Sequence, residues 1–186
     1  GLAIATIKRF RLGFAPESGS RLKSYMAEQG INEGQLIAAG LVIKPDDSPQ
    51  GRSREIYDRF RGRVIFPICD KSGRVIGFGG RIIGKGEPKY LNSPETILFQ
   101  KRASLYGLHH ATSATRKNED LIVVEGYMDV ISLSQAGFNG CVAPLGTALT
   151  EDQIQLLWRM NHEAIVCLDG DAAGTRAAIK TAEKAL

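Results

Sequence analysis

Short apolar runs alternate with amphipathic stretches through the C-terminal part of the chain. The runs cover residues 121–125, 141–144 and 164–169, and the first and last are apolar enough for strands buried on both faces. A helical pattern follows each run, at residues 127–136, 150–160 and 172–186. This alternation predicts a parallel sheet with helices on its faces.

The N-terminal part has a mixed pattern. Residues 63–69 and 74–83 are rich in β-forming side chains and flank a turn at 70–73, which predicts an antiparallel hairpin. Residues 84–102 are polar and irregular. Short helices are predicted over residues 2–10, 20–29, 32–39 and 103–116.

These patterns predict an α/β fold, with a smaller mixed α+β subdomain over residues 1–115 and the parallel-sheet domain over residues 116–186. The charge follows a similar division. Residues 1–110 hold 18 Lys plus Arg against 10 Asp plus Glu, a net charge of +8, whereas residues 111–186 hold 6 against 10, a net charge of −4. This suits a protein that holds a polyanion with one part and metal cations with the other, although chance surface charge explains it about as well.

Three arginines alternate along the basic part, at Arg59, Arg61 and Arg63. On a strand they would share one face. Such a face suits phosphates, by charge and by bidentate hydrogen bonds. The alternative is a solvated strand face that binds nothing.

The cysteines and histidines do not predict a zinc site in this chain. Cys69, Cys141 and Cys167 form no C-x-x-C pair, and the histidines lack ligand spacing. Buried free thiols in an intracellular, cytoplasmic protein are the expectation. No window approaches the roughly 18 continuous apolar residues of a membrane span, and there is no signal peptide.

Two predicted strands end in carboxylates. Glu125 ends the first run and Asp169 ends the last, with Asp171 two residues later and Asp129 in the first turn of the next helix. Carboxyl ends of parallel strands meet at one edge of a sheet, where ligands bind. Clustered carboxylates repel one another unless cations share the site, and Mg²⁺ prefers hard oxygen ligands.

Structural roles compete with this interpretation. Asp171 could only cap the last helix, since Asp-Gly-Asp is typical turn chemistry, and Asp129 could only interact with the helix dipole. Each role is the simpler explanation for one residue alone. Two acidic strand ends in one short α/β segment favour a metal site.

At these residues the chain resembles the Toprim fold of bacterial primases, type IA and type II topoisomerases and some nucleases. The shared pattern is Glu-Gly-x-x-Asp at 125–129 and Asp-x-Asp-x-x-Gly at 169–174. Further segments resemble the RNA polymerase core of DnaG-type bacterial primases in particular: residues 57–68, 73–81, 88–108, 125–130 and 145–150.

The resemblance implies roles for individual residues. Glu125 and Asp129 would be catalytic, and Glu125, Asp169 and Asp171 would bind Mg²⁺, with Mn²⁺ as a substitute. Nucleotide and template would be bound by residues matching family positions: Arg81, Lys89, Asn92, Lys101 and Tyr127, with Arg9 a looser match.

The implied function is primase activity, in which a DNA-directed RNA polymerase makes short RNA primers on single-stranded DNA by metal-dependent nucleotidyl transfer. The implied partners are the single-stranded template, ribonucleoside triphosphates and a replicative helicase at the bacterial replication fork, with no membrane. We expect the chain to be a piece of a longer protein, lacking the zinc-binding domain, the helicase-binding domain and the C-terminal end of the Toprim domain. This piece alone would then be weakly active or inactive.

Two alternatives remain from the sequence. One is another Toprim enzyme, a topoisomerase or nuclease, although nothing resembles the separate domain that carries a topoisomerase's tyrosine. The other is a binding module without catalysis, against which the retained Glu125, Asp169 and Asp171 argue.

Overall fold

The computed structural model describes residues 1–46, 55–146 and 148–185. Thr147, within one of the resembling segments, lies outside the described residues. The chain packs as two compact units whose segments interleave along the sequence. The first comprises Gly1–Arg11, Ile68–Ile76 and Gln100–Leu186, and the second Leu12–Pro67 and Gly77–Phe99. A single boundary at residue 115 therefore describes the order along the chain rather than the packing.

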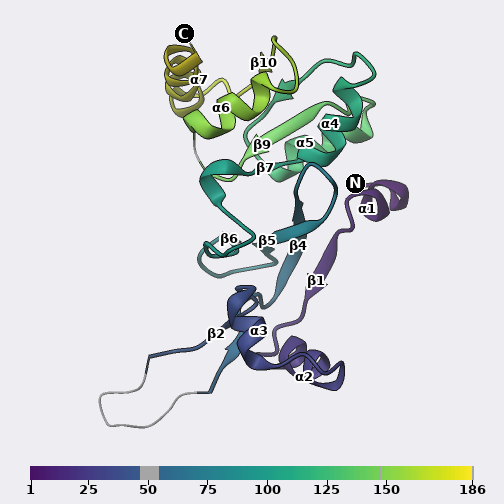
Figure 1. Cartoon of the computed structure of the whole chain (residues 1–186), viewed down its shortest axis with the longest axis vertical. Coiled ribbons are helices and arrows are strands. Elements are labelled where there is room, and N and C mark those ends of the chain that lie inside the picture. The colour runs from purple at the N-terminus through teal and green to yellow at the C-terminus, as the bar shows by residue number, and fades with distance from the viewer. Residues whose placement is uncertain (47–54, 147, 186) are drawn as a thin grey trace. The chain divides into compact units, whose positions relative to one another are not determined.

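The first unit contains the predicted parallel sheet (Figure 1). Its strand order is β10-β8-β9-β7. The three parallel strands are in register, with Val123 opposite Val142 and Val166 opposite Val123. The strands are β7 (Leu105–Tyr106), β8 (Ile122–Val123), β9 (Cys141–Pro144) and β10 (Ile165–Val166), of which β7 is antiparallel to β9.

Helices accompany this sheet as the amphipathic stretches predict. The helices are α1 (Ile4–Arg9), α4 (Leu108–Thr115), α5 (Tyr127–Gln135), α6 (Glu151–Trp158), α7 (Ala172–Ala185) and the 3₁₀ turn η1 (Lys101–Ala103). The apolar faces of α4 and α6 join the sheet in one core, whose buried members include Leu105, Leu108, Val142, Ile154 and Leu157. In the described ranges no helix is both long and apolar enough to cross a membrane.

One expectation for this sheet is wrong. The run at 164–169 was expected to be buried, yet Ile165 is 53% and Val166 41% exposed. The reason is that β10 is an edge strand, with a hydrogen-bonded neighbour on one side in the described structure. Cys167, next to β10, is exposed as well. Cys69, at the end of β4 (Arg63–Cys69) in a different sheet, is partly exposed, so Cys141 is the one buried thiol of the three that were expected to be buried.

The predicted helix over 103–116 begins late, at Leu108. Gly107 has a φ of 80°, and a Cβ there would come within 2.5 Å of the Cys141 carbonyl oxygen. This close approach requires glycine. Gly107 separates α4 from the short strand β7. The sequence pattern does not show β7, because this strand has only two residues.

The second unit is built on the sheet β1-β4-β5-β6. Its predicted hairpin is present: β4 and β5 are neighbours, and the Asp70 carboxylate accepts hydrogen bonds from the amides of Ser72 and Arg74 in the turn. Residues Ile68–Ile76, which include the turn of this hairpin, belong to the first unit. The strands are β1 (Gly13–Ala15), β4 (Arg63–Cys69), β5 (Val75–Ile82) and β6 (Tyr90–Asn92).

A smaller cluster completes this unit. The helices are α2 (Arg21–Glu28) and α3 (Glu33–Ala38), and β2 (Val42–Ile43) pairs with β3 (Tyr57–Asp58). Asp58 is 2% exposed, and its carboxylate accepts hydrogen bonds from the amides of Leu22 and Lys23, at 2.7 and 3.0 Å. The first turn of α2 is therefore capped from a distant segment.

The three alternating arginines do not form one exposed face. Arg59 and Arg61 lie outside strands, and Gly62, with a φ of 60°, interrupts the extended chain. Arg63 is 5% exposed and donates to the carbonyls of Gly80 and Lys89, both at 3.4 Å. Burial and the neighbouring Arg61 lower the pKa of Arg63.

Candidate functional site

The first unit brings together two acidic residues that follow β8 and β10, Glu125 and Asp169. Glu125 and Asp169 are both exposed, and a Glu125 carboxylate oxygen accepts a hydrogen bond of 3.0 Å from the Asp169 amide. β8 and β10 are neighbouring parallel strands, so their carboxyl ends lie at the same edge of the sheet. The two chain segments that carry these acids therefore meet, through the Glu125 side chain and the Asp169 backbone, and the convergence of the carboxylates of Glu125, Asp169 and Asp171 stays a prediction.

Gly174 makes this arrangement possible. It lies buried in the first turn of α7, where a Cβ would overlap the Asp169 carbonyl oxygen and come within 3.0 Å of Glu125 Oε1. A glycine therefore lets the helix backbone pack directly on the two acidic strand ends. This gives a physical reason for the glycine in the Asp-x-Asp-x-x-Gly pattern.

The other two acids make the local contacts that their structural interpretations predict. Asp171 Oδ1 accepts from the amides of Ala173 at 2.9 Å and Gly174 at 2.8 Å, which caps α7. Asp129 Oδ2 accepts from the Gly126 amide at 2.9 Å at the start of α5. Both carboxylates stabilise helix beginnings at the acidic edge.

The carboxylate oxygens at this edge are the kind of ligand that a hard divalent cation prefers. Glu125 and Asp169 offer exposed carboxylate oxygens, and Mg²⁺ commonly uses one or two carboxylates together with waters and substrate phosphates. In residues 1–46, 55–146 and 148–185, however, no three His, Cys, Asp or Glu side chains group closely enough to hold a metal ion. The observed grouping is a pair, and the metal-binding role of Asp171 stays a prediction.

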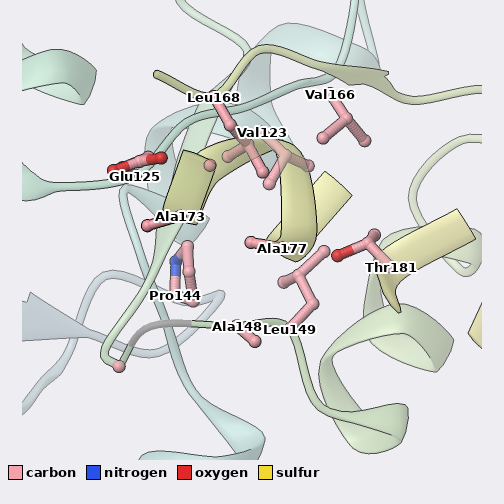
Figure 2. Close-up of a pocket in the computed structure, with 12 residues that line it drawn as sticks. Val123, Glu125, Pro144, Ala148, Leu149, Val166, Leu168, Ala173, Ala177 and Thr181 are labelled. Carbon is pink, nitrogen blue, oxygen red and sulfur yellow. The ribbon is translucent and has the colours of Figure 1, made fainter. Parts of the chain in front are cut away.

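A pocket of about 250 Å³ lies beside Glu125 (Figure 2). Glu125 lies at one end of the view and Thr181 at the other, with Ala173 and Ala177 of α7 between them. The opposite wall is formed by apolar side chains of the sheet and the segment after β9, among them Val123, Val166, Leu168, Pro144 and Leu149.

Lys101 reaches the rim of the same pocket. A Cβ added to Gly146, which lines the pocket, would lie 3.7 Å from Lys101 Cε and 3.9 Å from its Nζ. The structure therefore places the Lys101 side chain beside Gly146, a residue that lines the pocket together with Glu125.

Two other predicted residues of this unit are held by the fold. The Tyr127 side chain is 6% exposed and packs edge-on against Tyr106, with ring centroids 4.7 Å apart. Arg9 donates to the Asn139 side chain at 2.8 Å. The observed contacts of both residues are structural, and their predicted contacts with nucleotide or template stay predictions.

Arg81, Lys89 and Asn92 gather on two paired strands of the second unit. Arg81 pairs with Tyr90 in the β5–β6 register, and its guanidinium carbon lies 5.5 Å from the Tyr90 ring centroid. Lys89 is exposed, one residue before β6. Asn92 ends β6.

Sequence reasoning missed the residue that supports this strand. The Arg59 Nε and Nη2 atoms donate to the Asn92 carbonyl at 3.2 and 3.0 Å. Arg59 was predicted to face phosphates instead. Its charge was visible in the sequence, but the direction of its side chain was not.

Two family models match the chain. Residues 1–112 match the N-terminal domain of the DNA primase catalytic core, and residues 119–186 match the Toprim domain. The match over 1–112 favours the primase interpretation over a topoisomerase or another Toprim enzyme.

Curated relatives agree with the family models. The chain is 50% identical to the DNA primase of Escherichia coli (strain K12) over 186 residues, which is 100% of this chain and 31% of that protein. It is 49% identical to the DNA primase of Rickettsia bellii over 181 residues, 97% of this chain and 29% of that protein. The chain thus spans about a third of the length of these relatives.

Solved structures agree in fold. The chain matches the DnaG primase catalytic domain bound to single-stranded DNA with a TM-score of 0.87 and 48% identity, covering 100% of this chain and 56% of that one. It matches a DNA primase domain from Pseudomonas aeruginosa with a TM-score of 0.89 and 44% identity, at the same coverage.

Proposed function

Because the chain belongs to the family of DNA primase catalytic cores, we propose that it performs template-directed nucleotidyl transfer that makes short RNA primers on single-stranded DNA. The observation that supports this most is the meeting of Glu125 and Asp169 at one sheet edge. Lys101 at the rim of the adjoining pocket adds a cation where a triphosphate would need one.

Glu125 and Asp169 would hold Mg²⁺, with Mn²⁺ as a substitute, and Asp171 would join them if its capping contacts are released. The ion would supply charge stabilisation for the pyrophosphate leaving group and orient a ribonucleotide 3′-hydroxyl. The protein itself would contribute positioning. Lys101 would bind the triphosphate, and Asp129 would hold the Gly126 backbone beside Glu125.

The basic strands of the second unit would bind the template. Arg81, Lys89 and Asn92 offer charge and an amide without an array of stacking aromatics, which suits backbone contacts rather than sequence-specific reading. A related primase domain was solved bound to single-stranded DNA, which supports this assignment. A replicative helicase and the cytoplasmic replication fork are further expectations from family membership.

Primer synthesis tests this function. We would replace the matching segment of E. coli DNA primase with residues 1–186 and measure RNA synthesis from ribonucleotides on single-stranded DNA. Glu125→Gln should lower synthesis by at least about 100-fold. The carboxamide oxygen can still accept from the Asp169 amide, so template binding should be nearly unchanged. Glu163→Gln is the control, because this exposed acid precedes β10 and so lies at the opposite end of that strand from Asp169.

Metal binding gives a second readout that does not depend on activity. Mn²⁺ binding to the 186-residue chain can be followed by electron paramagnetic resonance. Asp169→Asn should weaken it and Glu163→Gln should not, because a carboxylate bound to a divalent ion contributes charge as well as an oxygen. Equal Mn²⁺ affinity in all three proteins would argue against a metal site at this edge.

A further inference from the structure

The turn that carries Lys101 is tied to the beginning of α6 by several hydrogen bonds. Gln153, in the first turn of α6, is 2% exposed. Its amide nitrogen donates to the Lys101 carbonyl at 3.2 Å and to the Ser104 carbonyl at 2.7 Å. One side chain thus bridges both ends of the segment that contains η1.

The orientation of the Gln153 amide is fixed by its surroundings. Its oxygen accepts from the Thr150 amide at 3.0 Å, so both of its N–H groups are directed at the two carbonyls. The reverse orientation would place the amide oxygen against two other oxygens. The buried amide can therefore hold the turn in one conformation.

Thr150 adds a second tie to the same turn. Its hydroxyl donates to the Arg102 carbonyl at 2.5 Å. The same hydroxyl accepts a hydrogen bond of 3.2 Å from the backbone N–H of Gln153. On the surface, Arg102 Nε donates to Asp152 at 2.9 Å. Three polar side chains at the N-terminus of α6, from residues 150, 152 and 153, therefore contact a single short turn.

The turn matters because of where Lys101 extends. The Lys101 side chain lies beside Gly146, which lines the same pocket as Glu125. A lysine side chain has four rotatable bonds, so the region that its ammonium can reach depends on where its backbone is held. Holding the backbone of residues 101–104 limits the ammonium to the region of this pocket.

We propose that Gln153 is a positioning residue, whose buried amide holds the Lys101 turn so that the Lys101 ammonium stays at the rim of the Glu125 pocket. This inference rests on the proposed function, in which that ammonium binds the triphosphate of a ribonucleotide. Gln153 itself contacts no substrate. Its effect reaches the nucleotide through Lys101.

A double-mutant cycle on the 186-residue chain tests this coupling. The probe is ATP with Mg²⁺, and its affinity is measured by isothermal titration calorimetry. Gln153→Met removes the two donated hydrogen bonds at similar side-chain length and should weaken ATP binding by about fivefold. Lys101→Met should weaken it by about tenfold, and the double variant should bind no more weakly than Lys101→Met alone.

The matched control is Gln155→Met. Gln155 lies on the same helix and is exposed, so its substitution should leave ATP affinity unchanged. Thr150→Val perturbs the same turn and takes the place of Gln153→Met if that variant does not fold. It removes the donation to the Arg102 carbonyl and should weaken ATP binding less than Gln153→Met, again with no further loss in the Lys101→Met background.

The outcomes separate the two proposals. If Lys101→Met leaves ATP affinity unchanged, the nucleotide-binding role of Lys101 is wrong and the role of Gln153 is wrong with it. If Lys101→Met weakens binding but Gln153→Met behaves like Gln155→Met, only the positioning role is wrong. If the losses from Gln153→Met and Lys101→Met add fully in the double variant, Gln153 acts through general stability, which also overturns the positioning role.

Discussion

The two units use their charged side chains in opposite ways. In the first, the Glu125 and Asp169 side chains remain exposed, and Glu125 accepts a hydrogen bond from a backbone amide, that of Asp169. In the second, Arg59 and Arg63 turn inward and donate to backbone carbonyls. The sign of a charge is visible in the sequence, but whether it faces a ligand or supports the fold is not.

The difference has a physical cause. A carboxylate directly after a parallel strand is placed at the sheet edge by the backbone, and its short side chain cannot leave that edge. An arginine side chain is long and presents five N–H donors, so it can turn toward the interior wherever carbonyls are available. Acidic positions are therefore the better guide to a site in this molecule.

The largest expected effect tests the acidic side of this comparison. Gly174→Ala should destabilise the chain by about 3 kcal/mol, because the added methyl group overlaps the Asp169 carbonyl and approaches Glu125. Urea unfolding measures the loss. Mn²⁺ affinity should fall as well, since the two strand ends must move apart.

Gly170→Ala is the control for this substitution. A Cβ at Gly170 would meet nothing within 4 Å, so stability should change by less than about 0.5 kcal/mol. Equal effects of the two substitutions would show that close packing of α7 does not hold the acidic edge together.

The next effect tests the basic side. Arg63→Met should cost about 2 kcal/mol of unfolding free energy, because it leaves the buried carbonyls of Gly80 and Lys89 without this donor. Arg61→Met, at an exposed residue over the Tyr57 ring, should cost less than about 1 kcal/mol. If Arg61 faces the template, Arg61→Met should lower the affinity for single-stranded DNA more than Arg63→Met does. A larger loss of stability from Arg61→Met would contradict the contrast between the two arginines.

The smallest effect concerns a half-buried base in the first unit, His110. Burial lowers the pKa of His110 from 6.5 to about 4, and the nearby cations Arg9, His109 and Arg11 add to this. Above pH 6.5 the ring is neutral in both folded and unfolded chains. As the pH falls from 6.5 to about 4, only the unfolded chain gains the proton, so stability falls by about 1–2 kcal/mol.

Urea unfolding at several pH values measures this dependence. His110→Phe keeps a ring against Phe10, whose centroid lies 4.7 Å from that of His110. It should flatten the part of the pH profile between 6.5 and 4. An unchanged slope in this variant would assign the pH dependence to other groups.

Much of the α/β fold could be predicted because the apolar runs are long enough to show their period. The strand predicted over 141–144 and the helix over 127–136 coincide with β9 and α5 to within a residue. The strands β6 and β7 could not be predicted, because they are short and do not lie within a longer apolar run, as the two-residue strands β8 and β10 do. The exposure of β10 depends on its place at the sheet edge, which local sequence does not encode.

The candidate site was predictable to a similar extent. That Glu125 and Asp169 lie at the same edge could be predicted, because the carboxyl ends of neighbouring parallel strands lie at one edge of a sheet. The contacts of Gln153 could not, because a capping-box glutamine carries no sign that its amide also reaches a turn some 50 residues earlier. Such contacts depend on packing between segments.

The cap of α2 has a consequence for how the chain is made. The carboxylate that satisfies the first amides of this helix belongs to Asp58, 36 residues after Leu22 and 35 after Lys23. During synthesis the helix leaves the ribosome before the residue that completes its first turn. The helix therefore reaches its full stability only after β3 has been synthesised and Asp58 can accept hydrogen bonds from these amides, which is later than the synthesis of the helix itself.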